Sequence, residues 1–311
     1  MTPIFPTWAR LARTSPETGH GSWEPAGEMA GEMMNLAHRT GAALAFAGLA
    51  VDAGSAHLGC WLDRLALRAA AVTVALDGRT EGEIEIRDAW HLARPDQNPG
   101  PAGRAFALWR RMAGKSAPLA EPELLTVIMG DVGIRNGEAL AEAIALARTL
   151  AESPLPPLTA VVETVAGSAA RCPGLPAVPL LLADAVLARR LRWPVAVPLL
   201  ALGLDRRPLR PTASDWPVPC LAALGRGCAV AWDLHGEIGR RAGTLQAVRG
   251  ALRSKSAGAV VEALLATDAL CPARLPGGMS DRAGRRLFDR LMALGAVREL
   301  TGRPVFRLYG L

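Results

Sequence analysis

Three arginines near the end of the chain have the type and spacing needed to contact nucleic acid. Arg282, Arg285 and Arg286 lie in the segment MSDRAGRRLFDRLMALG, where a helical period separates them from a leucine-rich face. A guanidinium group can bind a guanine edge through two hydrogen bonds, or it can contact a phosphate. The sequence therefore predicts a helix that presents these three side chains to DNA.

The ends and faces of this helix can also be predicted. Ser280 is a suitable N-cap, Asp281 adds favourable charge to the first turn, and Gly295 ends the helix. Asp289 falls on the arginine side. Four apolar positions spaced i, i+4, i+8 and i+11 are expected to face the core: Ala283, Leu287, Leu291 and Leu294.

Beyond this helix the segments VREL and VFRLY are predicted to pair as a hairpin. Gly302 would supply the positive φ of a tight turn within residues 301–304. Arg303 would then lie at the tip, with Arg298 and Arg307 on the strands, where they could contact phosphates or a minor groove. These three arginines extend the predicted DNA-binding surface.

An apolar helix, an arginine-rich helix and a hairpin follow one another in the order of a winged helix-turn-helix. The first helix is VVEALLATDAL, and the turn CPARLPGG after it leaves little room for the usual middle helix. Two alternatives stay open. The arginines could serve only to solubilise the helix, and winged helices also mediate protein contacts.

Two other residue pairs could do chemistry. Asp88 and His91 are spaced i, i+3 on one predicted helix, as in an oriented general base. Glu28 and Glu32 are spaced i, i+4 and could share a metal ion. For both pairs a solvated helix face or a structural hydrogen bond is the simpler interpretation, and the cluster RTEGEIEIRD is most simply a salt-bridged surface. An active site would be sought first around Arg79, Asp88 and His91.

The familiar cofactor and catalytic motifs are absent from the sequence. The tripeptide GKS at residues 114–116 lacks the glycine that a phosphate-binding loop requires five positions earlier, where Trp109 stands. There is no G-x-G-x-x-G after a strand, no G-x-S-x-G and no H-E-x-x-H. We therefore expect no cofactor and no metal, and an enzymatic activity is the less favoured interpretation.

Composition favours a globular protein of the reducing cytoplasm. The chain has 311 residues, half of them apolar, and its five cysteines never form C-x-x-C. The start of the chain lacks the pattern of a signal peptide, and the apolar runs are too short or too interrupted to cross a bilayer. No membrane association is expected.

The positive charge is concentrated near the end of the chain. From Arg249 onward there are 11 basic and 5 acidic residues, whereas residues 1–248 hold 24 of each. The overall net charge of +6 therefore belongs to the segment with the DNA-binding pattern. Such an excess favours a polyanionic partner.

The chain divides into four predicted parts. Residues 1–25 form an irregular N-terminal arm, 26–205 an α-helical body, 206–254 a connector and a long helix, and 255–311 the winged helix-turn-helix. Because no clearly alternating strand precedes residue 296, the predicted fold class is mainly α: a multi-helical body followed by a small winged helix-turn-helix with a β-hairpin wing.

Stretches such as GCWLDRLALRAAA, NPGPAGRAFALWRR, GEIGRRAGTLQAV and the ending MSDRAGRRLFDRLMALGAVRELTGRPVFRLYGL resemble the proteobacterial domain-of-unknown-function family 1403, which is often carried on plasmids. The resemblance spans nearly the whole chain and implies an architecture rather than a chemistry. The last fifty residues also resemble the winged helix that closes many Fic-type adenylyltransferases. The Fic signature H-P-F-x-x-G-N-G-R is absent, so no catalytic residue is implied.

Together these patterns predict a DNA-binding protein, either a transcriptional regulator or a plasmid accessory factor, whose body could support a homodimer. Two alternatives from other classes stay open. One is an enzyme with an unrecognised helical active site, and the other is a scaffold protein of a mobile element.

Overall fold

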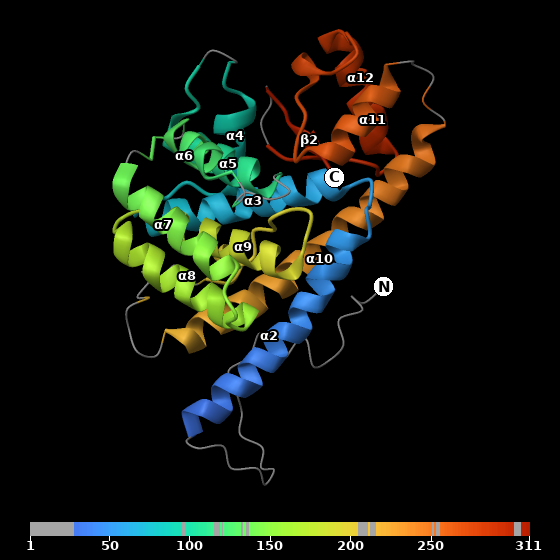
Figure 1. The fold of residues 1–311 in the computed structure, drawn as a ribbon. Coiled ribbons are helices and arrows are strands. Elements are labelled where there is room, and N and C mark those ends of the chain that lie inside the picture. The colour runs from blue at the N-terminus through green and yellow to red at the C-terminus, as the bar shows by residue number, and fades with distance from the viewer. Residues whose placement is uncertain are drawn as a thin grey trace.

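The computed structural model describes residues 28–94, 97–114, 119, 121–131, 133–134, 137–204, 211, 216–250, 252, 256–301 and 306–311, with side chains except at 28–30 and 124. The predicted N-terminal arm, residues 1–25, lies outside this set. The described chain is mainly helical, as predicted, and carries a two-stranded sheet near its end (Figure 1).

The helices of the body follow one another with short connections. Their bounds are α2 Glu28–Asp52, α3 Leu58–Leu76, α4 Glu83–His91, α5 Gly100–Ala113, α6 Pro122–Asp131, α7 Gly137–Ala151, α8 Pro157–Arg171, α9 Ala177–Leu191, the 3₁₀ helix η3 Ala201–Gly203, and α10 Pro217–Arg249. Within the described residues, no helix is both long enough and apolar enough to cross a bilayer.

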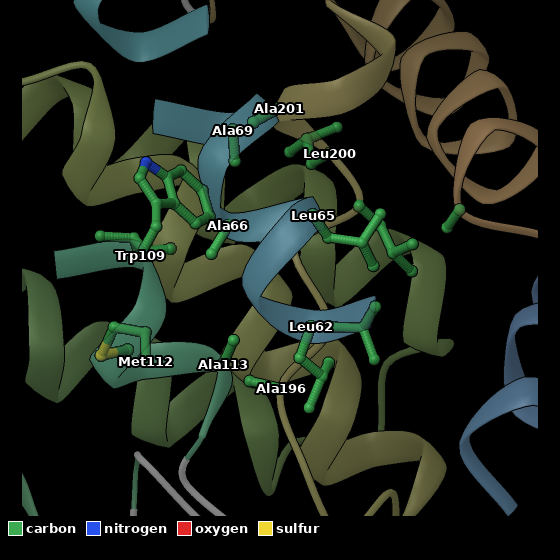
Figure 2. Close-up of a cluster of buried hydrophobic side chains, with 14 of the residues drawn as sticks. Leu62, Leu65, Ala66, Ala69, Trp109, Met112, Ala113, Ala196, Leu200 and Ala201 are labelled. Carbon is green, nitrogen blue, oxygen red and sulfur yellow. The ribbon is translucent and has the colours of Figure 1, made fainter. Parts of the chain in front are cut away.

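Helix α3 lies at the centre of the body, because apolar residues occur on nearly every side of it. It packs against α4, α5, η3, α10 and α11, and most of its side chains are buried. Figure 2 shows its face toward α5 and the segment before η3. The buried side chains labelled there are Leu62, Leu65, Ala66, Ala69, Trp109, Met112, Ala113, Ala196, Leu200 and Ala201.

The long helix predicted from about Val218 to Arg253 is observed as α10, which lies beside α2 (Figure 1). Its predicted apolar stripe is buried at Cys220, Leu224, Cys228, Ala231 and Ile238, and His235 is half-buried. Helical periodicity therefore located both the helix and its core-facing side.

A buried carboxyl group fixes the segment that crosses α10. Asp184 of α9 accepts hydrogen bonds from the backbone N–H groups of Leu199 (3.2 Å) and Leu200 (3.1 Å), just before η3. Burial raises the pKa of Asp184 to about 8, although both hydrogen bonds oppose the shift. Asp184 therefore pairs two backbone donors that would otherwise be buried without a partner.

Two glycines allow the same segment to touch the backbone of α10. A Cβ on Gly203 would lie 1.8 Å from the carbonyl oxygen of Ala223, and a Cβ on Gly227 would lie 1.9 Å from that of Leu199. Such distances are far below van der Waals contact, so the two backbones meet only because both residues lack a side chain.

We expect Gly227→Ala to lower the free energy of unfolding by about 3 kcal/mol, the upper end of the cost of overpacking a core. The matched control is Gly243→Ala in the same helix, where a Cβ would meet nothing within 4 Å. That control should gain roughly 0.5–1 kcal/mol through helix propensity. Urea denaturation of both variants measures the difference, and equal stabilities would contradict the close crossing.

The end of the chain forms a small helix–sheet unit, which we call the C-terminal unit (residues 256–311). Its elements are α11 Ala257–Ala266, the 3₁₀ helix η4 Pro272–Arg274, α12 Asp281–Ala293, β1 Arg298–Glu299 and β2 Tyr309–Gly310. The strands are antiparallel, with Arg298 opposite Gly310 and Glu299 opposite Tyr309.

A third segment joins this sheet between α11 and η4. Leu270 and Tyr309 exchange both backbone hydrogen bonds, at 2.8 and 2.9 Å, so the order across the sheet is Leu270, β2, β1. The expected hairpin pairing is observed at residues 298–299 and 309–310. The proposed tight turn at Gly302 lies outside the described residues.

The predicted core face of α12 was partly wrong. Leu291 is buried as expected, but Ala283 is exposed and Leu294 is 42% exposed. Gly284 and Phe288 are buried instead. The reason is steric: a Cβ on Gly284 would lie 3.0 Å from the Pro272 carbonyl oxygen, so only a glycine lets α12 approach η4 this closely.

Phe288 then completes the core of the C-terminal unit. Its ring stacks on Tyr309 of β2 with centroids 4.4 Å apart and planes 9° apart. Both side chains are buried. The contact holds α12 across the sheet and fixes which of its faces is left to solvent.

Candidate functional site

The start of α12 is as the sequence predicted. The Oγ atom of Ser280 accepts a hydrogen bond from the backbone N–H of Ala283 at 3.4 Å, so Ser280 is the N-cap. Asp281 lies in the first turn and pairs with Arg285 at 2.8 Å, one turn further along the helix. Arg285 is still 70% exposed at its side chain.

The solvent face of α12 carries a row of arginines. Arg282, Arg286, Asp289 and Ala293 are all exposed, and their i, i+4, i+7, i+11 spacing puts them opposite Phe288. Arg285 and Arg290, also exposed, lie to either side of this row. We call these four arginines, 282, 285, 286 and 290, the α12 ridge.

Two members of the α12 ridge have no acidic partner within the described part of the chain. No described carboxylate lies within 4.0 Å of a guanidinium nitrogen of Arg282 or Arg286. Within the described part of the chain, neither guanidinium group is therefore neutralised by an ion pair. The ridge is available to a polyanion without first breaking an ion pair at these two positions.

Arg298 and Arg307, the arginines of the hairpin, differ from Arg282 and Arg286 because each approaches a carboxylate. Arg298 approaches Glu237 of α10 at 3.7 Å, and Arg241 approaches the same carboxylate at 3.1 Å. Partial burial, and then the neighbouring Arg241 charge, lower the pKa of Arg298. Arg307 lies 3.5 Å from Glu299 across the hairpin. Both predicted contacts thus share their charge with a carboxylate, and Arg303 lies outside the described residues.

The residues singled out for possible catalysis are only partly brought together. Asp88 is buried and His91 is half-buried on α4. Of the two simpler interpretations, Asp88 therefore does not fit a solvated helix face, and a structural role stays open for it. Arg79 instead pairs with Glu81 at the exposed end of the preceding loop. Glu32 is exposed, and the Glu28 side chain lies outside those described.

No metal site emerges from these residues. Among the described residues, no three His, Cys, Asp or Glu side chains come together in a way that could hold a metal ion. The structure therefore gives no support to a shared metal at Glu32.

An ionic cluster that sequence reasoning missed lies under the C-terminal unit. Asp268, which follows α11, is fully buried and pairs with Arg64 of α3 and with Arg87 of α4, the latter at 2.6 Å. The guanidinium group of Arg64 also donates to the backbone oxygens of Asp268 (3.2 Å) and Leu311 (3.3 Å). One carboxylate thus binds two helices of the body.

A second carboxylate extends the cluster to α5. Asp63 accepts the backbone N–H of Asp268 at 3.3 Å and the Nε–H of Arg110 at 2.8 Å. We call Asp63, Arg64, Arg87, Arg110 and Asp268 the Asp268 cluster. It holds the C-terminal unit on three helices of the body.

The charges of the Asp268 cluster fit this role. Burial alone would raise the pKa of Asp268, but Arg64 and Arg87 outweigh it and lower the pKa to about 2. For Asp63 the balance is reversed: burial raises its pKa, and Arg110 opposes the shift only partly. Asp268 is therefore the carboxylate that the two buried arginines hold in its charged form.

The only signal for this cluster in the sequence is the pair Asp63–Arg64 inside GCWLDRLALRAAA. Charged residues are rarely buried without partners, so two charges within so apolar a helix indicate partners elsewhere. Nothing local identifies Asp268 as that partner, because it follows 204 residues later.

These features define a mainly α-helical protein whose C-terminal helix–sheet unit is fixed to a helical body and exposes an arginine-rich helix. The chain belongs to the family described as "Protein of unknown function (DUF1403)", whose model matches residues 3–311. No curated protein and no solved structure matches it.

Proposed function

We propose that this protein binds double-stranded DNA through α12 and the adjoining hairpin. The observation that carries the proposal is the α12 ridge. Its arginines lie on a capped helix, opposite the buried Gly284 and Phe288, and two of them have no described acidic partner. A helix of this kind can enter a major groove with guanidinium groups toward base edges or phosphates.

The order of elements in the C-terminal unit supports the same proposal. The elements follow in the order α11, the bridging residue Leu270, η4, α12, β1 and β2, and β2 is central in the sheet. This is the order of a winged helix-turn-helix with a shortened second helix. In that arrangement α12 is the recognition helix, and the segment between β1 and β2, with Arg303 and Arg307, is the wing.

The rigid attachment of the C-terminal unit to the body supports a role in DNA binding. The Asp268 cluster joins the C-terminal unit to three helices of the body, so a change in the body would be transmitted to α12 rather than lost in a linker. We therefore propose a transcriptional regulator or a plasmid accessory factor, in which the body contributes contacts to a second copy of the chain.

Fluorescence anisotropy with labelled 30-base-pair duplexes tests this function directly. The panel includes the region upstream of the gene and a shuffled duplex of equal composition. We expect the protein to bind DNA, and the logarithm of the association constant to fall linearly with the logarithm of the salt concentration. The slope should be about −0.9 for each phosphate contacted. Absence of binding to every duplex at low salt would rule out the proposed function.

A further inference from the structure

A cleft lies where the C-terminal unit meets the body, and Ala269 in its lining follows Asp268 in the chain. It has a volume of about 390 Å³. One wall comes from the end of α4 and the described residues after it: Trp90, His91, Ala93, Arg94, Gln97 and Pro99. The other wall comes from the segment after α11: Ala269, Leu270, Cys271 and Arg274. Its size is near the lower end of the roughly 300–1,000 Å³ that is usual for ligand sites.

Arg274 ties the two walls together. Its guanidinium group donates to the carbonyl oxygens of Ala93 (2.6 Å), His91 (3.3 Å) and Leu92 (3.4 Å), the last carbonyls of α4 and the loop that follows. The cleft is therefore a preformed space with a fixed width rather than a gap between two independent parts.

The walls are largely apolar and include aromatic rings. Trp90 packs edge-on against Phe106 with ring centroids 6.0 Å apart, and this contact fixes the orientation of the indole ring. Burial lowers the pKa of His91 to about 4, and its imidazole is therefore neutral at pH 7. Four apolar side chains add to the lining, which also includes the amide of Gln97 and the thiol of Cys271: Ala93, Pro99, Ala269 and Leu270.

The charge of the described lining is positive. Arg94 and Arg274 both line the cleft, and no carboxylate is present among the described lining residues. Arg274 is occupied with carbonyl oxygens, whereas Arg94 is exposed at the rim and has no described carboxylate within 4.0 Å. Arg94 is therefore the group best placed to receive an anion.

We propose that this cleft binds a small aromatic carboxylate of one or two fused rings, with its ring against Trp90 and its carboxylate toward Arg94. The planar guanidinium group matches a carboxylate through two hydrogen bonds, and the ring replaces water on an apolar wall. The buried Nε2 atom of His91, which has no hydrogen-bond partner in the described structure, offers one further polar contact. This inference does not depend on DNA binding.

Cys271 provides a direct readout. Of the five cysteines, four are buried, and Cys271 is the partly exposed one that lines the cleft. Alkylation of the native full-length chain by iodoacetamide, followed by intact mass, should therefore add a single label, which Cys271→Ser abolishes. A ligand in the cleft should slow this labelling.

We expect saturating indole-3-acetate to slow labelling by about tenfold or more, and indole-3-acetamide and inorganic phosphate to have little effect, because the site needs both the ring and the charge. Arg94→Gln should weaken protection about tenfold, and Trp90→Leu should remove it. Arg111→Gln, an exposed arginine of α5 paired with Asp131, is the control and should protect like wild type.

Three results would overturn the proposal. The first is no protection by indole-3-acetate or benzoate at millimolar concentration. The second is equal protection by the amide, and the third is equal protection by phosphate, which would indicate an anion site without a ring. Arg94 is at the surface, so Arg94→Gln should fold normally, and it tests the site even if Trp90→Leu does not fold.

Discussion

Asp268→Ala is expected to lower the free energy of unfolding by about 3–5 kcal/mol, the cost of breaking a buried ion pair by removing one partner. The reason is that the substitution leaves two buried guanidinium groups without their carboxylate. Arg64 and Arg87 would be left buried with no carboxylate between them, and the desolvation of two guanidinium groups would no longer be offset. Urea denaturation followed by circular dichroism measures the loss.

The control is a carboxylate of the same C-terminal unit that has a similar ion pair on the surface. Asp281→Ala removes the partner of Arg285, where both side chains are largely exposed, and should cost no more than about 1 kcal/mol. A loss for Asp268→Ala no larger than for this control would show that the Asp268 cluster does not hold the C-terminal unit on the body.

Acid titration separates charge from packing in this cluster. The pKa of Asp268 is lowered to about 2, so its contribution is present above the unfolded pKa of about 4 and is lost as the pH falls from about 4 toward 2. In Asp268→Ala this part of the pH dependence should disappear. The wild type should therefore lose more stability than the variant between pH 4 and pH 2.

The features that the sequence predicted well are local ones. The apolar stripe of α10 and the Ser280 N-cap each depend on residues within a few turns of one another, and both are observed. Helical periodicity also predicts that Arg282 is exposed, because on an amphipathic surface helix the positions opposite the buried face point to solvent. Local pattern is therefore sufficient for these two features and for the exposed arginines of α12.

The features that it missed depend on contacts between distant segments. The predicted core face of α12 included Ala283 and Leu294, which are exposed. Close packing on η4 selected Gly284 instead, and a residue without a side chain carries no hydrophobic signal. Likewise the polar run containing Arg87 and Asp88 has the composition of a surface, yet Arg87 meets a carboxylate 181 residues later. Only the tertiary fold identifies such partners.

The double charge reversal Arg282→Glu/Arg286→Glu is expected to weaken DNA binding by at least about 100-fold at low salt. Each substitution removes a contact worth roughly 1–3 kcal/mol and adds repulsion toward the phosphates. Folding should be unaffected, because both side chains are exposed and have no described acidic partner to lose. Anisotropy with the same duplexes measures the affinity, and circular dichroism checks the fold.

A matched double reversal elsewhere separates a site from a general effect of net charge. Arg111→Glu/Arg189→Glu changes the charge by the same amount on α5 and α9, where the arginines pair with Asp131 and Glu152 on the surface of the body. It should retain DNA affinity within a few-fold, since only long-range repulsion is added. If both double variants lose affinity equally, the α12 ridge is not the binding surface. If neither loses it, α12 takes no part in contacting DNA.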